Sequence, residues 1–149
     1  MKELFAAFYE NLAGIWNQNF PLVFSTLYQN GGYIKLGLLF ILVALFLWLL
    51  FYYAWRYPYG RLWHWALWLV ITAVVVYVGS WWVARSEILS SANEALNEAL
   101  NDPESGYRNY ARGLPVKYAL VNMLAATVLG FVYSLILKQF SKIQMHLPF

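Results

Sequence analysis

Three long apolar runs dominate the pattern of the chain. They cover residues 33–55, 62–84 and 115–137, and the only charges within them are Lys35 and Lys117, each close to an end of its run. Each run of 23 residues makes roughly 34 Å of helix, which is enough to cross a hydrocarbon core of about 30 Å. The pattern therefore predicts an all-α integral membrane protein with three transmembrane helices.

A more mixed segment, residues 1–32, precedes the first run. Its apolar residues recur at helical spacing, and Pro21 suits the first turn of a second short helix, "PLVFSTLYQ", which ends at the turn residues 30–32. The apolar positions are Leu4, Phe5, Phe8, Leu12, Ile15 and Trp16. We expect an interfacial amphipathic helical segment that lies on the membrane surface. The alternative is that its apolar face packs on a partner or on another copy of the chain.

Residues 85–102 continue the second run without an obvious helix breaker. Between Leu62 and Asp102 there is no proline and a single glycine, Gly79. This predicts one helix of about 40 residues whose last part is an extramembrane extension, stopped before Pro103 and followed by a return loop over 103–114. The alternative is that the extension turns at the membrane surface and lies flat on it.

The extension ends in the repeat "NEALNEALND", residues 93–102. Under a helical reading, its alanines and leucines form a narrow apolar seam, with the glutamates and asparagines away from it. The seam residues are Leu89, Ala92, Leu96, Ala99 and Leu100. We expect this seam to be an extramembrane contact surface; a merely solvated helix face is the alternative.

Within the runs, small and polar residues recur at helical intervals. Membrane helices associate through close backbone approach and polar contacts, because apolar burial gains little in lipid. The third run carries Asn122, Ala126, Gly130 and Ser134 at intervals of four, and the second carries Ala66, Ala73 and Ser80 at intervals of seven. These positions are the predicted helix-packing residues.

Aromatic residues mark the predicted membrane surfaces. Tryptophan and tyrosine favour the headgroup level. The expected interfacial anchors are Trp55, Tyr57, Tyr59, Trp63 and Trp65 on one side and Trp81 and Trp82 on the other. The short hairpin loop, residues 56–61, makes the first two spans antiparallel. The distribution of lysine and arginine favours placing this loop and the C-terminal tail, residues 138–149, in the cytoplasm, with the protein in a bacterial inner membrane.

Several chemistries are excluded or disfavoured by composition. The chain has no cysteine, and no Asp or Glu falls within the three runs. A transporter usually needs an ionisable group inside the membrane. His64 is the only histidine near a span, which gives no paired haem or metal ligands, and no phosphate-loop, nucleophile–base or basic nucleic-acid motif is present. We therefore expect no catalytic, cofactor or metal site.

These patterns favour a non-enzymatic integral membrane subunit, an anchor, scaffold or channel-forming component of a larger assembly. Its expected partners are membrane lipid, other membrane-protein subunits and copies of itself. The alternative is a small pore-forming protein, since three spans in 149 residues resemble phage holins in outline. A small transporter or membrane enzyme is a third hypothesis.

Overall fold

The computed structural model of the chain describes residues 1–55 and 62–141, and this part is helical without a strand. Three long helices lie side by side: α3 (Gly32–Leu49), continued by the π-helical turn η2 (Leu50–Ala54), then α4 (Leu62–Leu89) and α6 (Tyr107–Phe140). All three are long and apolar enough to cross a membrane. The predicted hairpin loop, with Tyr57 and Tyr59, and the tail beyond Ser141 lie outside the described residues.

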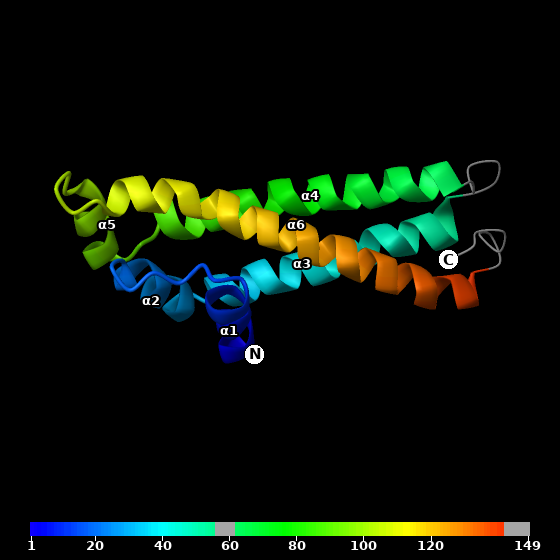
Figure 1. Ribbon diagram of the computed structural model, residues 1–149, viewed down its shortest axis with the longest axis horizontal. Helices are drawn as coiled ribbons and strands as arrows, with labels where there is room; N and C mark the ends of the chain where they lie inside the picture. The colour runs from blue at the N-terminus through cyan, green and yellow to red at the C-terminus, as the bar shows by residue number, and fades with distance from the viewer. Residues whose placement is uncertain (56–61, 142–149) are drawn as a thin grey trace.

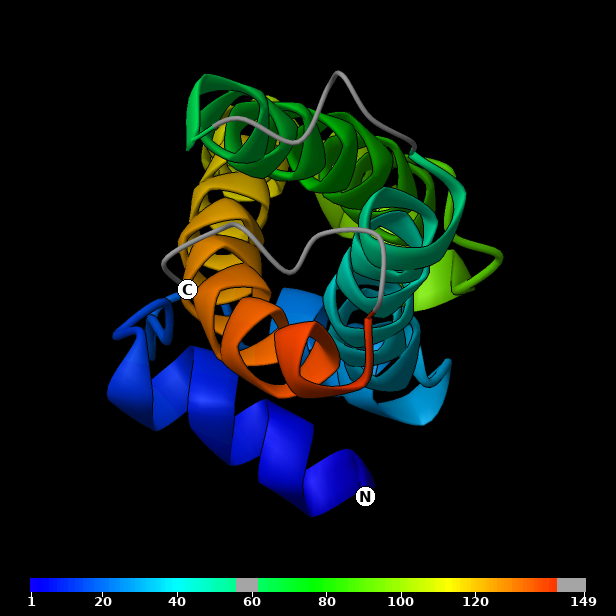
Figure 2. The same ribbon diagram turned by 90° about the vertical axis from the view of Figure 1, so that its right-hand side faces the viewer.

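Each long helix turns one face inward at intervals of four residues. Residues four apart lie on nearly the same side of a helix, so these intervals create one continuous contact face per helix. The buried positions that follow this interval are Leu36, Phe40, Ala44 and Trp48 on α3; Thr72, Val76, Ser80, Ala84 and Ile88 on α4; and Tyr118, Asn122, Ala126, Gly130 and Ser134 on α6. Helix α6 runs obliquely across the other two (Figure 1), and the end-on view shows all three surrounding one interior (Figure 2).

The prediction of a single helix from Leu62 to Asp102 is wrong. Helix α4 ends at Leu89, and a separate helix, α5 (Glu94–Asn101), follows after a short break. Side-chain bonds to the backbone cause the break: Ser91 Oγ accepts from the Asn93 nitrogen at 3.2 Å, and Asn93 Oδ1 caps α5 by accepting from the Leu96 nitrogen at 3.2 Å. Serine and asparagine favour such local bonds over helix continuation, so no glycine or proline is needed.

The predicted return loop is also wrong in most of its length. Helix α6 begins at Tyr107, directly after Gly106 in a left-handed conformation with φ 71°, and Pro115 lies inside the helix instead of opening it. The side chains around this proline explain why the helix continues, since Ala111, Leu114 and Pro115 are all buried against the rest of the bundle. Tertiary packing here outweighs the local cost of proline in a helix.

The N-terminal segment is helical, as predicted, but its buried face is different. Helix α1 (Lys2–Ala7) and the π-helical turn η1 (Phe8–Leu12) run across the bundle (Figures 1 and 2). Phe5, Tyr9 and Ile15 are buried, whereas Leu4 and Leu12 are 68% and 78% exposed. The predicted second helix is confirmed, because α2 covers Pro21–Gln29 with its proline in the first turn.

Helix α5 packs on the same molecule, beside α2 and the start of α6. Of the predicted seam, Leu96 and Leu100 are buried in the core, Leu89 and Ala99 are half-buried, and Ala92 is exposed. The two central leucines are therefore an internal contact, and they are not available to a partner as the sequence suggested.

Replacing Leu96 and Leu100 together with asparagine should release α5 from the bundle. Burying two amides in place of two leucines costs roughly 4 kcal/mol or more in the docked state. We expect protease sensitivity and fast amide exchange over residues 90–106, with the long helices still protected. Ala92→Asn, at an exposed position, is the matched control. Exchange in α5 as slow as in the unmodified protein would contradict this packing.

Candidate functional site

The centre of the bundle is organised by one buried amide, that of Asn122. Its Oδ1 accepts a hydrogen bond from Tyr9 Oη at 2.6 Å, and its Nδ2 donates to the Leu36 carbonyl oxygen at 3.0 Å and to Ser80 Oγ at 2.8 Å. These bonds join α6 to η1, α3 and α4. Asn122 is fully buried. One side chain thus ties together all three long helices and the N-terminal segment.

Tyr9 brings the N-terminal segment into this polar centre. Its ring stacks on Tyr33 at 5.8 Å between centroids and meets Tyr118 edge-on at 5.3 Å. The Tyr33 hydroxyl in turn donates to the Glu10 carboxylate. Burial raises the pKa of the Tyr9 hydroxyl above its usual range, so it stays protonated and can donate to Asn122. The sequence reading missed Tyr9 because a tyrosine in an amphipathic segment has no pattern that distinguishes it from an interfacial one.

A second polar contact lies toward the other end of the bundle, at Ser134. Its Oγ is within 2.6 Å of Tyr52 Oη and accepts from Trp65 Nε1 at 2.8 Å. Ser141 Oγ donates to the Tyr52 carbonyl oxygen at 2.6 Å. These bonds join η2, α4 and α6 around an aromatic cluster of buried Trp48, Phe51 and Tyr52.

The structure places all four predicted packing residues of α6 in the bundle interior. Ala126 and Gly130 lie between the polar contacts of Asn122 and Ser134, and Gly130 sits directly against the Trp48 indole. On α4, Ser80 is buried and bonded to Asn122, but Ala66 and Ala73 are only half-buried. The buried residues of α4 recur at intervals of four and include the large Val76 and Ile88. The predicted spacing of seven therefore identified only one of these buried residues, Ser80.

The predicted interfacial anchors differ in exposure. Trp55, Trp63 and Trp82 are exposed, and Trp81 is half-buried beneath Arg85, whose guanidinium carbon lies 5.2 Å from the ring centroid. Trp65 is half-buried and bonds to Ser134. Trp65 therefore contributes to helix packing, whereas the other four tryptophans remain suited to the membrane surface.

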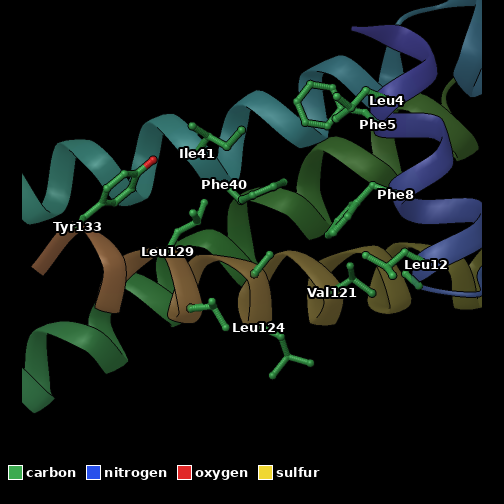
Figure 3. Close-up of a pocket in the computed structure, with 13 residues that line it drawn as sticks. Leu4, Phe5, Phe8, Leu12, Phe40, Ile41, Val121, Leu124, Leu129 and Tyr133 are labelled. Carbon is green, nitrogen blue, oxygen red and sulfur yellow. The ribbon is translucent and has the colours of Figure 1, made fainter. Parts of the chain in front are cut away.

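An apolar groove of about 720 Å³ lies between the N-terminal segment and the bundle. Figure 3 shows α1 and η1 forming one wall, with α3 and α6 forming the other. The lining residues are Leu4, Phe5, Phe8, Leu12, Ala13, Phe40, Ile41, Val121, Leu124, Ala125, Val128, Leu129 and Tyr133. The Tyr133 side chain supplies the only hydroxyl among them. Such a surface suits a hydrocarbon chain or an apolar helix.

No metal-binding group of three or more His, Cys, Asp or Glu side chains occurs in residues 1–55 and 62–141. His64 is half-buried near the start of α4. The candidate site in the described residues is the apolar groove, together with the helices that line it. No family model matches the chain, and no curated protein or solved structure matches it.

Proposed function

We propose that the chain is a non-enzymatic integral membrane scaffold subunit that holds an apolar helix of a partner membrane protein in its groove. The observation that carries this proposal is the apolar groove, which lies open beside a bundle whose helices are joined by internal hydrogen bonds. Asn122, Ser80 and Ser134 all bond to other helices of the same chain. The buried polar groups of the long helices thus hold the scaffold together.

The α6 wall of the groove has the spacing of a helix-binding surface. Val121, Leu124, Ala125 and Val128 recur at intervals of three and four along two turns, with the small Ala125 in the middle. A helix docks on another by placing its side chains between such rows, and small residues in membrane helices permit close approach. This geometry favours a helix as the occupant of the groove over a disordered lipid chain.

The proposed position in the bilayer follows from residues that favour its surfaces. On α4, the stretch from Trp63 to Trp82 is about 28 Å of helix, and on α6 the stretch from Lys117 to Lys138 is about 31 Å. Both lengths match a hydrocarbon core of about 30 Å. In this arrangement α5 lies on one side of the membrane. The opposite end of the bundle, where η2 ends and α4 begins, lies on the other side and is called the hairpin end. We further propose a bacterial inner membrane, with the hairpin end in the cytoplasm.

The exposed faces of the long helices favour this scaffold over the pore-forming alternative. The most exposed residues of the described spans include Leu42, Phe46, Val70, Val74, Val78, Leu124 and Val128. Several copies arranged around water would need a polar face directed toward it. These faces are instead apolar, as lipid and partner helices require.

Crosslinking from the groove tests the proposal. The chain contains no cysteine, so Leu124→Cys introduces a unique thiol for a photoreactive maleimide. Val74→Cys is the control, because Val74 is 53% exposed on α4 and Leu124 is 62% exposed in the groove. In native membranes we expect a discrete protein adduct from Leu124→Cys and none from Val74→Cys. Adducts to lipid alone, or the same protein adducts at both positions, would contradict the proposal.

A further inference from the structure

Three arginines meet in a pocket at the end of the bundle, where α4, α5 and α6 come together. This arginine pocket has a volume of about 250 Å³. Helices α4 and α6 each contribute two residues one turn apart, and α5 contributes three. The lining residues are Arg85 and Leu89 from α4, Asn97, Leu100 and Asn101 from α5, and Arg108 and Arg112 from α6. The break after α4 is what folds α5 back to form this pocket.

In the described part of the chain, no acidic side chain lines the arginine pocket or forms an ion pair with one of its arginines. The one ion pair among residues 1–55 and 62–141 joins Lys35 to Glu87, at 2.5 Å, and none of the pocket's lining residues is acidic. Of the acids close to the pocket residues in sequence, Glu87 pairs with Lys35, and Asp102 lines a neighbouring pocket with Arg108, where its carboxylate accepts from the Glu104 nitrogen at 3.0 Å. Three like charges around one pocket repel one another, and a bound anion would convert that repulsion into attraction.

Contacts with neighbouring residues hold two of the polar side chains of the arginine pocket in place. Asn97 Nδ2 donates to the Ser91 carbonyl oxygen at 2.8 Å, and the Arg85 guanidinium lies over the Trp81 ring. A guanidinium presents several N–H donors in a plane and can bind two oxygens of a phosphate at once. The pocket that the three arginines line, at about 250 Å³, has room for one phosphate group.

We propose that the arginine pocket binds a phosphate group, either of an anionic phospholipid headgroup or of a soluble phosphate. This anion site does not depend on the partner-binding groove, because its lining residues come from α4, α5 and α6. The lipid source depends on the proposed bilayer position, which places Trp81 and Arg85 at the headgroup level. Lysine and arginine near a membrane surface attract anionic lipids.

Lipid retention by the full chain tests this site. We would incorporate the protein into nanodiscs of phosphatidylcholine with or without phosphatidylglycerol, release it, and count bound phosphatidylglycerol by native mass spectrometry. For Arg108→Gln/Arg112→Gln we expect about a tenfold loss of retained phosphatidylglycerol, since two charge-assisted contacts are removed. Lys117→Gln removes one surface charge from the same helix outside the pocket, and we expect it to lose much less phosphatidylglycerol than the double variant.

A second arm separates the two phosphate sources. Inorganic phosphate is titrated against the protein in phosphatidylcholine nanodiscs, with protection of Arg108 and Arg112 from an arginine-specific reagent as the readout. Protection by phosphatidylglycerol alone assigns a lipid headgroup, and protection by inorganic phosphate assigns a soluble source. Phosphatidylglycerol retention that is unchanged in Arg108→Gln/Arg112→Gln, or protection of Arg108 and Arg112 in the unmodified protein by neither anion, would overturn the proposal. Helical content by circular dichroism checks that each variant folds. The second variant is Arg108→Lys/Arg112→Lys, which keeps the positive charges but loses the planar guanidinium groups. It should also lose retained phosphatidylglycerol.

Discussion

Asn122→Ala will destabilise the bundle by about 2–3 kcal/mol, because it removes three interhelical hydrogen bonds and leaves buried polar atoms without partners. The Tyr9 hydroxyl loses its acceptor, and Ser80 Oγ loses a donor. Helix–helix hydrogen bonds in membranes average only about 0.6 kcal/mol each, so most of the effect comes from the stranded groups. The measurement is reversible unfolding in mixed detergent micelles, followed by circular dichroism.

Asn109→Ala is the matched control for Asn122→Ala, since Asn109 is an exposed asparagine on the same helix. We expect its effect to stay within about 0.5 kcal/mol. Tyr9→Phe in combination with Asn122→Ala completes a double-mutant cycle, in which the two changes should be strongly non-additive. Additive effects, or equal stability of the Asn122 and Asn109 variants, would show that the Asn122 contacts do not organise the bundle.

Gly130→Ala will destabilise the bundle by about 1–3 kcal/mol through overpacking. A Cβ at this position would lie 2.5 Å from Trp48 Nε1 and 3.1 Å from Trp48 Cε2. The indole cannot easily move away, because Trp48 is fully buried and packs on Phe51 and Tyr52. The same unfolding measurement would report the loss.

Gly113 provides the control, because a Cβ added there would meet nothing within 4 Å. Gly113→Ala should be neutral or stabilising by about 0.5–1 kcal/mol, as expected for alanine in a helix. Adding Trp48→Leu to Gly130→Ala should reduce the penalty of the added methyl group by providing room for it. A Gly130→Ala variant as stable as Gly113→Ala would contradict the close approach of α6 and α3.

The sequence predicted the features that depend on composition and on small-residue spacing. The sequence predicted three helices that are long and apolar enough to cross a membrane, and it predicted the extent of α2. The ladder from Asn122 to Ser134 could be identified because small and polar residues are unusual inside an apolar run. The structure buries these residues together.

The features that sequence reading missed depend on tertiary contacts. Val76 and Ile88 face inward on α4, but in a membrane helix a large apolar residue suits lipid and protein interior equally well. The end of α4 was missed because serine and asparagine break the helix through side-chain bonds that periodicity does not reveal. The arginine pocket was missed for a related reason: it forms only once α5 folds back beside α4 and α6.

Cysteine accessibility in intact cells tests the central claim, that the three long helices cross the membrane with α5 and the hairpin end on opposite sides. The labelling positions are Ala92→Cys beside α5 and Gln139→Cys near the end of α6, both exposed, with Val74→Cys in the middle of α4. An impermeant maleimide should label Ala92→Cys from outside, Gln139→Cys only after the membrane is opened, and Val74→Cys in neither case. Labelling of Ala92→Cys and Gln139→Cys from the same side, or of Val74→Cys from water, would contradict the three-span arrangement.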